Sequence, residues 1–180
     1  MKLKYKPLFL LFIITFFSSC LNNIDFDQVN LDLEPVINTP LVFFELDQLD
    51  FFDELNNTEI ETVTDISDLE VLESSTVRDN LLKVDFTFEA DNRFDRNIFM
   101  EIDFLDDSEN ITFSLNSFTI AAGNRDYRLE QTIDIVNSPG FLNSTKIRAR
   151  ANLTSSNITI DPSIPSTLGF KSSAVFFLSF

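Results

Sequence analysis

The sequence predicts an all-β fold, an antiparallel β-sandwich, on three observations. Apolar and polar residues alternate with a period of two over most of the chain after residue 25. Turn-forming residues separate these runs, and no segment sustains the 3.6-residue period of an amphipathic helix. Alternation of this kind gives each strand one buried and one solvent-facing side, as in antiparallel sheets that pack on one face.

The alternating runs define the strands that we expect along the chain. The clearest run is 82–89, where leucine, valine and phenylalanine alternate with charged residues and threonine. Run 174–180 is apolar at nearly every position, which is typical of a central strand. Run 41–46 alternates imperfectly, and 60–66 lies in an acidic, irregular stretch, 47–80. The expected strands are 29–33, 41–46, 60–66, 82–89, 98–104, 111–115, 127–135, 146–153 and 174–180.

Turn signals between the runs favour antiparallel hairpins. They lie at 91–97, 106–110, 123–124 and 138–140, where Asn, Asp, Gly, Pro and Ser gather. Residues 138–144 fit one helical turn, and two prolines mark a loop before the last strand. Seven to nine strands over this length predict an Ig-like or similar β-sandwich.

The N-terminal segment has the organisation of a secretory signal. Met1–Pro7 is short and basic, and Leu8–Phe17 is a ten-residue apolar run, too short to span a bilayer as a helix. Ser18 and Ser19 supply the small side chains that signal peptidases require, and Cys20 follows. Because Cys20 is the only cysteine of the chain, we expect cleavage before it and attachment of a diacylglycerol to its sulfur.

The stretch Phe17-Ser18-Ser19-Cys20 resembles the lipobox of bacterial lipoproteins. The mature part, rich in Asn, Asp, Ile and Phe, is similar in style to outer-membrane lipoproteins of Bacteroidetes bacteria. The resemblance implies an outer-membrane location in the cell envelope, with acyl chains on Cys20 as the contact with the membrane. Leu21 replaces the Asp that marks inner-membrane retention in enteric lipoproteins. The resemblance implies no activity and leaves the surface or periplasmic orientation open.

Length favours a single folded domain after this segment. The chain has 180 residues, and a part of about 160 residues buries roughly 70% of its unfolded surface. We therefore expect a signal peptide at 1–19, the acylated cysteine and a short tether at 20–28, and one sandwich domain at 29–180.

Charge excludes one class of partner. The chain carries 13 basic and 29 acidic residues, for a net charge of −16, and three of its lysines lie in the signal. A strongly acidic mature protein repels phosphate backbones, so we expect no nucleic-acid partner. A protein or glycan ligand remains compatible with the composition.

Composition also removes most catalytic chemistry. The chain has no histidine, one cysteine and three glycines. Serine–histidine and cysteine–histidine pairs, histidine–cysteine zinc sites and glycine-rich phosphate loops are therefore excluded. We expect a non-catalytic binding or structural module without a cofactor. Paired carboxylates leave a carboxylate-based hydrolase as an alternative.

Two clusters of charged residues are candidate sites. Four acidic residues gather at a predicted hairpin end and offer the oxygen ligands that calcium takes; the other interpretation is a solvated acidic turn. Three basic residues share the solvent-facing side of 146–153, where they could meet an acidic glycan or a partner, or pair with acidic residues on neighbouring strands. These residues are Asp103, Asp106, Asp107 and Glu109 in the first cluster, and Lys146, Arg148 and Arg150 in the second.

Phenylalanines suggest two further hypotheses. Phe51 and Phe52 would form a partner-binding patch if both were exposed, and would otherwise pack in the core. The apolar run that ends at Phe180 resembles the closing strand of outer-membrane barrels, which makes a small β-barrel an alternative to the sandwich.

Overall fold

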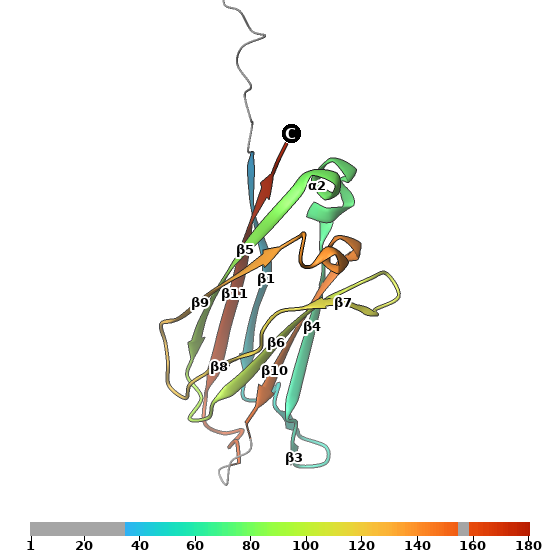
Figure 1. Cartoon of the computed structure of the whole chain (residues 1–180). Helices are drawn as coiled ribbons and strands as arrows, with labels where there is room; N and C mark the ends of the chain where they lie inside the picture. The colour runs from blue at the N-terminus through green and yellow to red at the C-terminus, as the bar shows by residue number, and fades with distance from the viewer. Residues whose placement is uncertain (1–34, 155–158) are drawn as a thin grey trace, which may run out of the picture. The chain divides into compact units, whose positions relative to one another are not determined.

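The computed structural model of the chain describes residues 35–154 and 159–180. These residues form two antiparallel sheets that face each other, with short helical segments in the connections (Figure 1). The predicted β-sandwich is therefore confirmed. The signal peptide, Cys20, the tether at 20–28 and the expected strand 29–33 lie outside the described residues.

The first sheet has four strands in the order β1-β11-β5-β9. Every ladder in it is antiparallel, and its neighbours are far apart in sequence. The strand β1 pairs with β11, the last strand of the chain. The bounds are β1 (Val36–Asp47), β11 (Thr167–Leu178), β5 (Leu81–Asn92) and β9 (Tyr127–Asp134).

The second sheet has five strands and follows the order β4-β10-β6, after which β7 and β8 both pair with β6. A separate two-stranded hairpin joins β2 and β3. Among residues 35–154 and 159–180, two 3₁₀ helices and one short α-helix lie in the connections. The bounds are β2 (Phe52–Asp53), β3 (Thr58–Glu59), β4 (Thr62–Asp68), η2 (Glu70–Glu73), α2 (Ser75–Asn80), β6 (Ile98–Leu105), β7 (Ile111–Ser114), β8 (Phe118–Ile120), η3 (Pro139–Asn143) and β10 (Lys146–Leu153).

The core lies between the two sheets and is built largely of phenylalanine. Phe86 of β5 and Phe104 of β6 face each other across it, with ring centroids 5.5 Å apart. Phe141 of η3 closes one side, edge-on to Phe104 at 4.8 Å. Each aromatic ring buries a large apolar area, so packing accounts for much of the phenylalanine content.

Several sequence expectations need correction. The turn at 91–97 does not close a hairpin, because it carries the chain from β5 in one sheet to β6 in the other. Most strands that are consecutive in the sequence likewise do not pair with each other. The last strand begins at Thr167, earlier than expected. The helical turn at 138–144 is confirmed as η3. The barrel alternative is wrong, because the described strands form two separate sheets with unpaired outer strands and not one closed sheet.

Both ends of the described domain lie together. Val36, the first residue of β1, pairs with Phe177 near the end of β11. Figure 1 shows the start of β1 and the C-terminus at the same end of the sandwich. The polypeptide that precedes residue 35 therefore joins the sandwich at one end, beside the C-terminus.

Candidate functional site

A β-bulge in β1 places one phenylalanine on the protein surface. The register of β1 against β11 shifts between Pro40 and Phe43, so that two residues of β1 lie opposite Ser172. The Ser172 hydroxyl occupies the gap and accepts a hydrogen bond from the backbone N–H of Val42 at 3.1 Å. Strict alternation would have turned Phe43 inward, but the extra residue turns it outward, where it is 76% exposed.

The same bulge turns the next residue, Phe44, toward the core. Phe44 packs against the core and stacks on Phe170 of β11, with ring centroids 5.0 Å apart. The bulge therefore explains why the sequence alternates imperfectly over 41–46. With the bulge, the Phe44 ring faces the core and the Phe43 ring faces solvent; strict alternation would have placed them the other way round.

Phe43 lies at the junction of two depressions on the outer face of the four-stranded sheet. Their volumes are about 500 and 650 Å³. We call the pair the β1–β9 groove. One row of cross-strand neighbours borders both depressions: Phe43, Lys171, Glu89 and Arg128.

Ion pairs fix the polar side chains of this row. Lys171 Nζ lies 2.6 Å from one carboxylate oxygen of Glu89, and Arg128 donates to the other at 2.8 Å. Arg128 also pairs with Glu130 at 2.9 Å. The hydrogen bond from Lys171, with the charges of Lys171 and Arg128, holds the pKa of Glu89 below its ordinary value. Glu89 therefore stays ionised and keeps its neighbours in place.

The smaller depression extends past Gly169. A Cβ atom at this position would meet nothing closer than the Asp91 Cβ at 4.0 Å, so the glycine leaves open space between β1 and β5. Arg93 donates two hydrogen bonds to one oxygen of Asp91, at 3.0 and 2.8 Å. The other oxygen, Oδ1, is enclosed and has no hydrogen-bond partner among the described residues. Arg125 lines the same depression and makes no ion pair within the described part of the chain.

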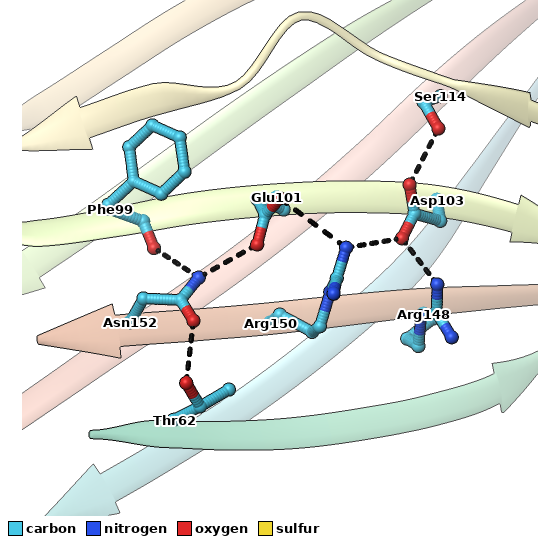
Figure 2. A network of polar contacts seen from close by, with 8 residues as sticks. All are labelled: Thr62, Phe99, Glu101, Asp103, Ser114, Arg148, Arg150 and Asn152. Atoms are coloured by element: carbon cyan, nitrogen blue, oxygen red, sulfur yellow. Dashed lines mark hydrogen bonds and ion pairs between the residues drawn. The ribbon is translucent and has the colours of Figure 1, made fainter.

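A polar network covers the outer face of the opposite sheet (Figure 2). Asp103 of β6 is 4% exposed. It accepts hydrogen bonds from Arg148 at 2.7 Å, from Arg150 at 3.0 Å and from the Ser114 hydroxyl at 2.6 Å. Burial disfavours the ionised carboxylate, but the Ser114 hydrogen bond and the two arginines outweigh burial and lower the pKa of Asp103.

The network continues along the sheet through Glu101. Arg150 lies 3.4 Å from Glu101. Asn152 donates to Glu101 at 3.0 Å and accepts from the Thr62 hydroxyl at 2.7 Å, which links β4, β10 and β6 (Figure 2). Lys146 lies 3.6 Å from Glu109. Each of the three basic residues of the stripe thus has an acidic neighbour, on strand β6 for Arg148 and Arg150 and in the turn after β6 for Lys146.

The four acidic calcium candidates do not come together. Asp103 is occupied by the two arginines. Asp106 closes its own turn by accepting hydrogen bonds from the backbone N–H groups of Ser108 and Asn110, each at 2.9 Å. Glu109 contacts Lys146, and Asp107 is exposed. Within residues 35–154 and 159–180, no three acidic side chains are grouped closely enough to hold a metal ion.

The phenylalanine patch proposed from sequence is also wrong in part. Phe51 is fully buried and packs edge-on against Phe94, with centroids 5.5 Å apart. Phe52 lies half-buried in β2. Among the described residues the most exposed phenylalanine is Phe43 instead, which sequence reasoning missed. Pro40 within a strand and the broken alternation after it were the available signals, because both are typical of bulges and edge strands.

None of the helices in the described ranges is long and apolar enough to cross a membrane. No protein-family model matches the chain, and no curated protein matches it.

Solved structures show distant likenesses only. A protein of infectious bursal disease virus, Gx strain, is 8% identical with a TM-score of 0.47 over 82% of this chain and 33% of its own. A candidate secreted protein from Parabacteroides distasonis is 8% identical with a TM-score of 0.48, over 64% of this chain and 38% of its own. The active domain of tailspike protein 4 from bacteriophage CBA120 is 14% identical with a TM-score of 0.40, over 82% and 19%. This chain thus spans between 19% and 38% of the length of these proteins, and the likenesses assign it to no family.

Proposed function

We propose that this chain is a lipid-anchored lipoprotein of the bacterial cell envelope whose non-catalytic β-sandwich binds a ligand in the β1–β9 groove. The observation that carries the binding role is the exposure of Phe43 between two depressions. Burying a phenylalanine side chain contributes about 1.5–3 kcal/mol, so a ligand that covers the exposed Phe43 ring gains part of that free energy. Bulges that re-aim a side chain are frequent at functional sites.

The sequence supports the anchor. The resemblance to Bacteroidetes-type outer-membrane lipoproteins at Phe17 to Cys20 favours acylation of Cys20 and attachment to the outer membrane. Two or three acyl chains anchor a protein stably, at about 0.8 kcal/mol for each buried methylene. The described part of the chain begins at the end of the sandwich where Val36 of β1 pairs with Phe177 of β11.

The electrostatics of the groove favour binding over the hydrolase alternative. A carboxylate hydrolase needs one carboxyl group with a raised pKa as its general acid. The Lys171 hydrogen bond lowers the pKa of Glu89, and the Arg93 hydrogen bond lowers that of Asp91. These two of the three groove carboxyls therefore remain ionised near neutral pH and are suited to accept hydrogen bonds.

The single cysteine makes one experiment test both halves of the proposal. Ser173 lines the larger depression, and Thr64 lies on the outer face of the opposite sheet. We would place a cysteine at each position in the full chain, S173C and T64C, and measure the rate of maleimide labelling on intact cells and on purified protein.

The unaltered chain should remain unlabelled even after denaturation, because acylation consumes the Cys20 sulfur. The S173C thiol should react several-fold more slowly on cells than in purified protein, because ligand covers the groove, and the T64C thiol should react equally in both. A labelled Cys20 would overturn the anchor. Equal rates for S173C on cells and in solution would overturn ligand binding in the groove.

A further inference from the structure

We propose that the ligand of the β1–β9 groove is an uncharged oligosaccharide chain that stacks one sugar ring on Phe43. This inference rests on the proposed function for the location of the ligand, and it adds the chemical class. It follows from the charge balance of the groove, the exposed aromatic ring and the length of the surface.

The charges of the groove balance. Three basic side chains line the smaller depression, and three acidic side chains lie among them. Most are already paired, as in the row from Lys171 through Glu89 to Arg128. The molecule as a whole carries a net charge of −16. A polyanion would be repelled by that field, and a polycation would find more favourable acidic surface elsewhere. A neutral ligand meets no electrostatic penalty here.

The paired side chains suit hydroxyl groups. Ionised donors and acceptors make hydrogen bonds roughly twice as strong as neutral ones. Because Glu89 and Arg128 hold each other, their positions are set before a ligand arrives, which lowers the entropy cost of binding. A sugar hydroxyl both donates and accepts, so it can bond a carboxylate and a guanidinium side by side.

Phe43 supplies the apolar element of the site. One face of a pyranose ring carries mainly C–H groups, and this face packs on an aromatic ring. The ring of Phe43 is 76% exposed and borders both depressions, so a chain lying across it would extend into each. Gly169, on the neighbouring strand, leaves room beside the ring.

The groove has the dimensions of a chain rather than of a compact molecule. Along β11 it extends from Val175, which lines the larger depression, to Gly169, which lines the smaller one. These seven residues are separated by six steps along the strand, which correspond to about 20 Å. That length accommodates several sugar rings in sequence.

The test is affinity electrophoresis of the detergent-solubilised full-length protein in gels that contain neutral polysaccharides: dextran, laminarin, mannan and xylan. Alginate and polygalacturonate serve as acidic probes. At least one neutral polysaccharide should retard the protein. Phe43→Ala should weaken that binding at least tenfold, and Phe43→Trp should preserve it. Ile66→Ala removes an exposed apolar side chain from the other sheet and should leave binding unchanged.

A second readout is the dependence on salt. Binding of a neutral chain should change less than twofold between 50 and 500 mM NaCl, since few counterions are released. Absence of binding to every neutral polysaccharide, retardation by the acidic probes alone, or equal binding by the Phe43→Ala variant would overturn the inference. If S173C is protected on cells while no neutral polysaccharide binds, the groove has a ligand of another class, such as a protein, and only this inference fails. If S173C is not protected, the proposed function fails first.

Discussion

Replacing Asp103 by alanine removes the acceptor at the centre of the network on the five-stranded sheet. Three hydrogen bonds disappear, from Arg148, Arg150 and Ser114, and two guanidinium groups lose their shared carboxylate. A hydrogen bond to a charged group contributes about 1.5–3 kcal/mol, and breaking a buried ion pair costs about 3–5 kcal/mol. The arginine side chains are 21% and 31% exposed, so water re-solvates them in part. We therefore expect a loss of about 3 kcal/mol, at the lower end of that range.

Urea unfolding followed by circular dichroism measures this loss, and thermal unfolding should show a Tm lower by about 6–12 °C. The control is Asp107→Ala, an exposed position with no role in the network, which should change stability by no more than about 0.5 kcal/mol. A loss below about 1 kcal/mol for Asp103→Ala, or one equal to that of the control, would refute the argument that the network holds β6, β7 and β10 together.

The same variant gives a signed dependence on pH. The pKa of Asp103 is lower in the folded protein than its ordinary value of 3.8. Its ionised form therefore stabilises the fold fully above that ordinary value, and this contribution is lost as the pH falls through the folded-state pKa. The stability difference between the unaltered protein and Asp103→Ala should be constant near neutral pH and should narrow below about pH 4. A difference that widens in acid would contradict the sign.

Two further pairs of substitutions distinguish buried positions from exposed ones. A Cβ at Gly140 would lie 2.6 Å from the carbonyl oxygen of Thr112, so Gly140→Ala should lower the free energy of unfolding in urea by about 1–3 kcal/mol. A Cβ at Gly169 would meet nothing closer than 4.0 Å, so Gly169→Ala should leave that free energy unchanged; its added methyl group should narrow the groove and weaken ligand binding. Phe86→Ala removes a fully buried ring and should lower the free energy of unfolding by about 3–5 kcal/mol. Phe43→Ala removes an exposed ring and should change it by less than about 0.5 kcal/mol. Equal losses for the two variants would contradict the outward orientation of Phe43.

The sequence predicts the sandwich well wherever one strand face is buried and the other is wet. β10 follows the alternation residue by residue, and β5 does so from Val84 onward, because each packs one face on the core and carries its charges on the other. At the start of β5 a register shift against β11 buries Leu81 and leaves Leu82 exposed, contrary to the alternation. The pairing of the basic stripe on β10 with acidic residues on β6 follows from the same logic. The period of two says nothing, however, about which strand lies next to which. Consequently, the pairing of β1 with β11 and the crossing between sheets at 91–97 were not predictable from it.

The site itself depends on a departure from alternation. One extra residue before Phe43 reverses which of two adjacent phenylalanines faces the core, and the hydroxyl that fills the gap, Ser172, comes from the far end of the chain. The helix α2 escaped prediction for a related reason, since six residues are too few to establish a helical period. In both places the outcome is decided by contacts between distant segments, and a local pattern does not contain them.

The measurement that most directly tests the central claim is the intact mass of the protein extracted in detergent from its own membranes. The account predicts a polypeptide that begins at Cys20 and carries the added mass of a diacylglycerol, with or without a further acyl chain on the new N-terminus. A polypeptide that retains residues 1–19, begins elsewhere, or carries a free thiol at Cys20 would contradict it.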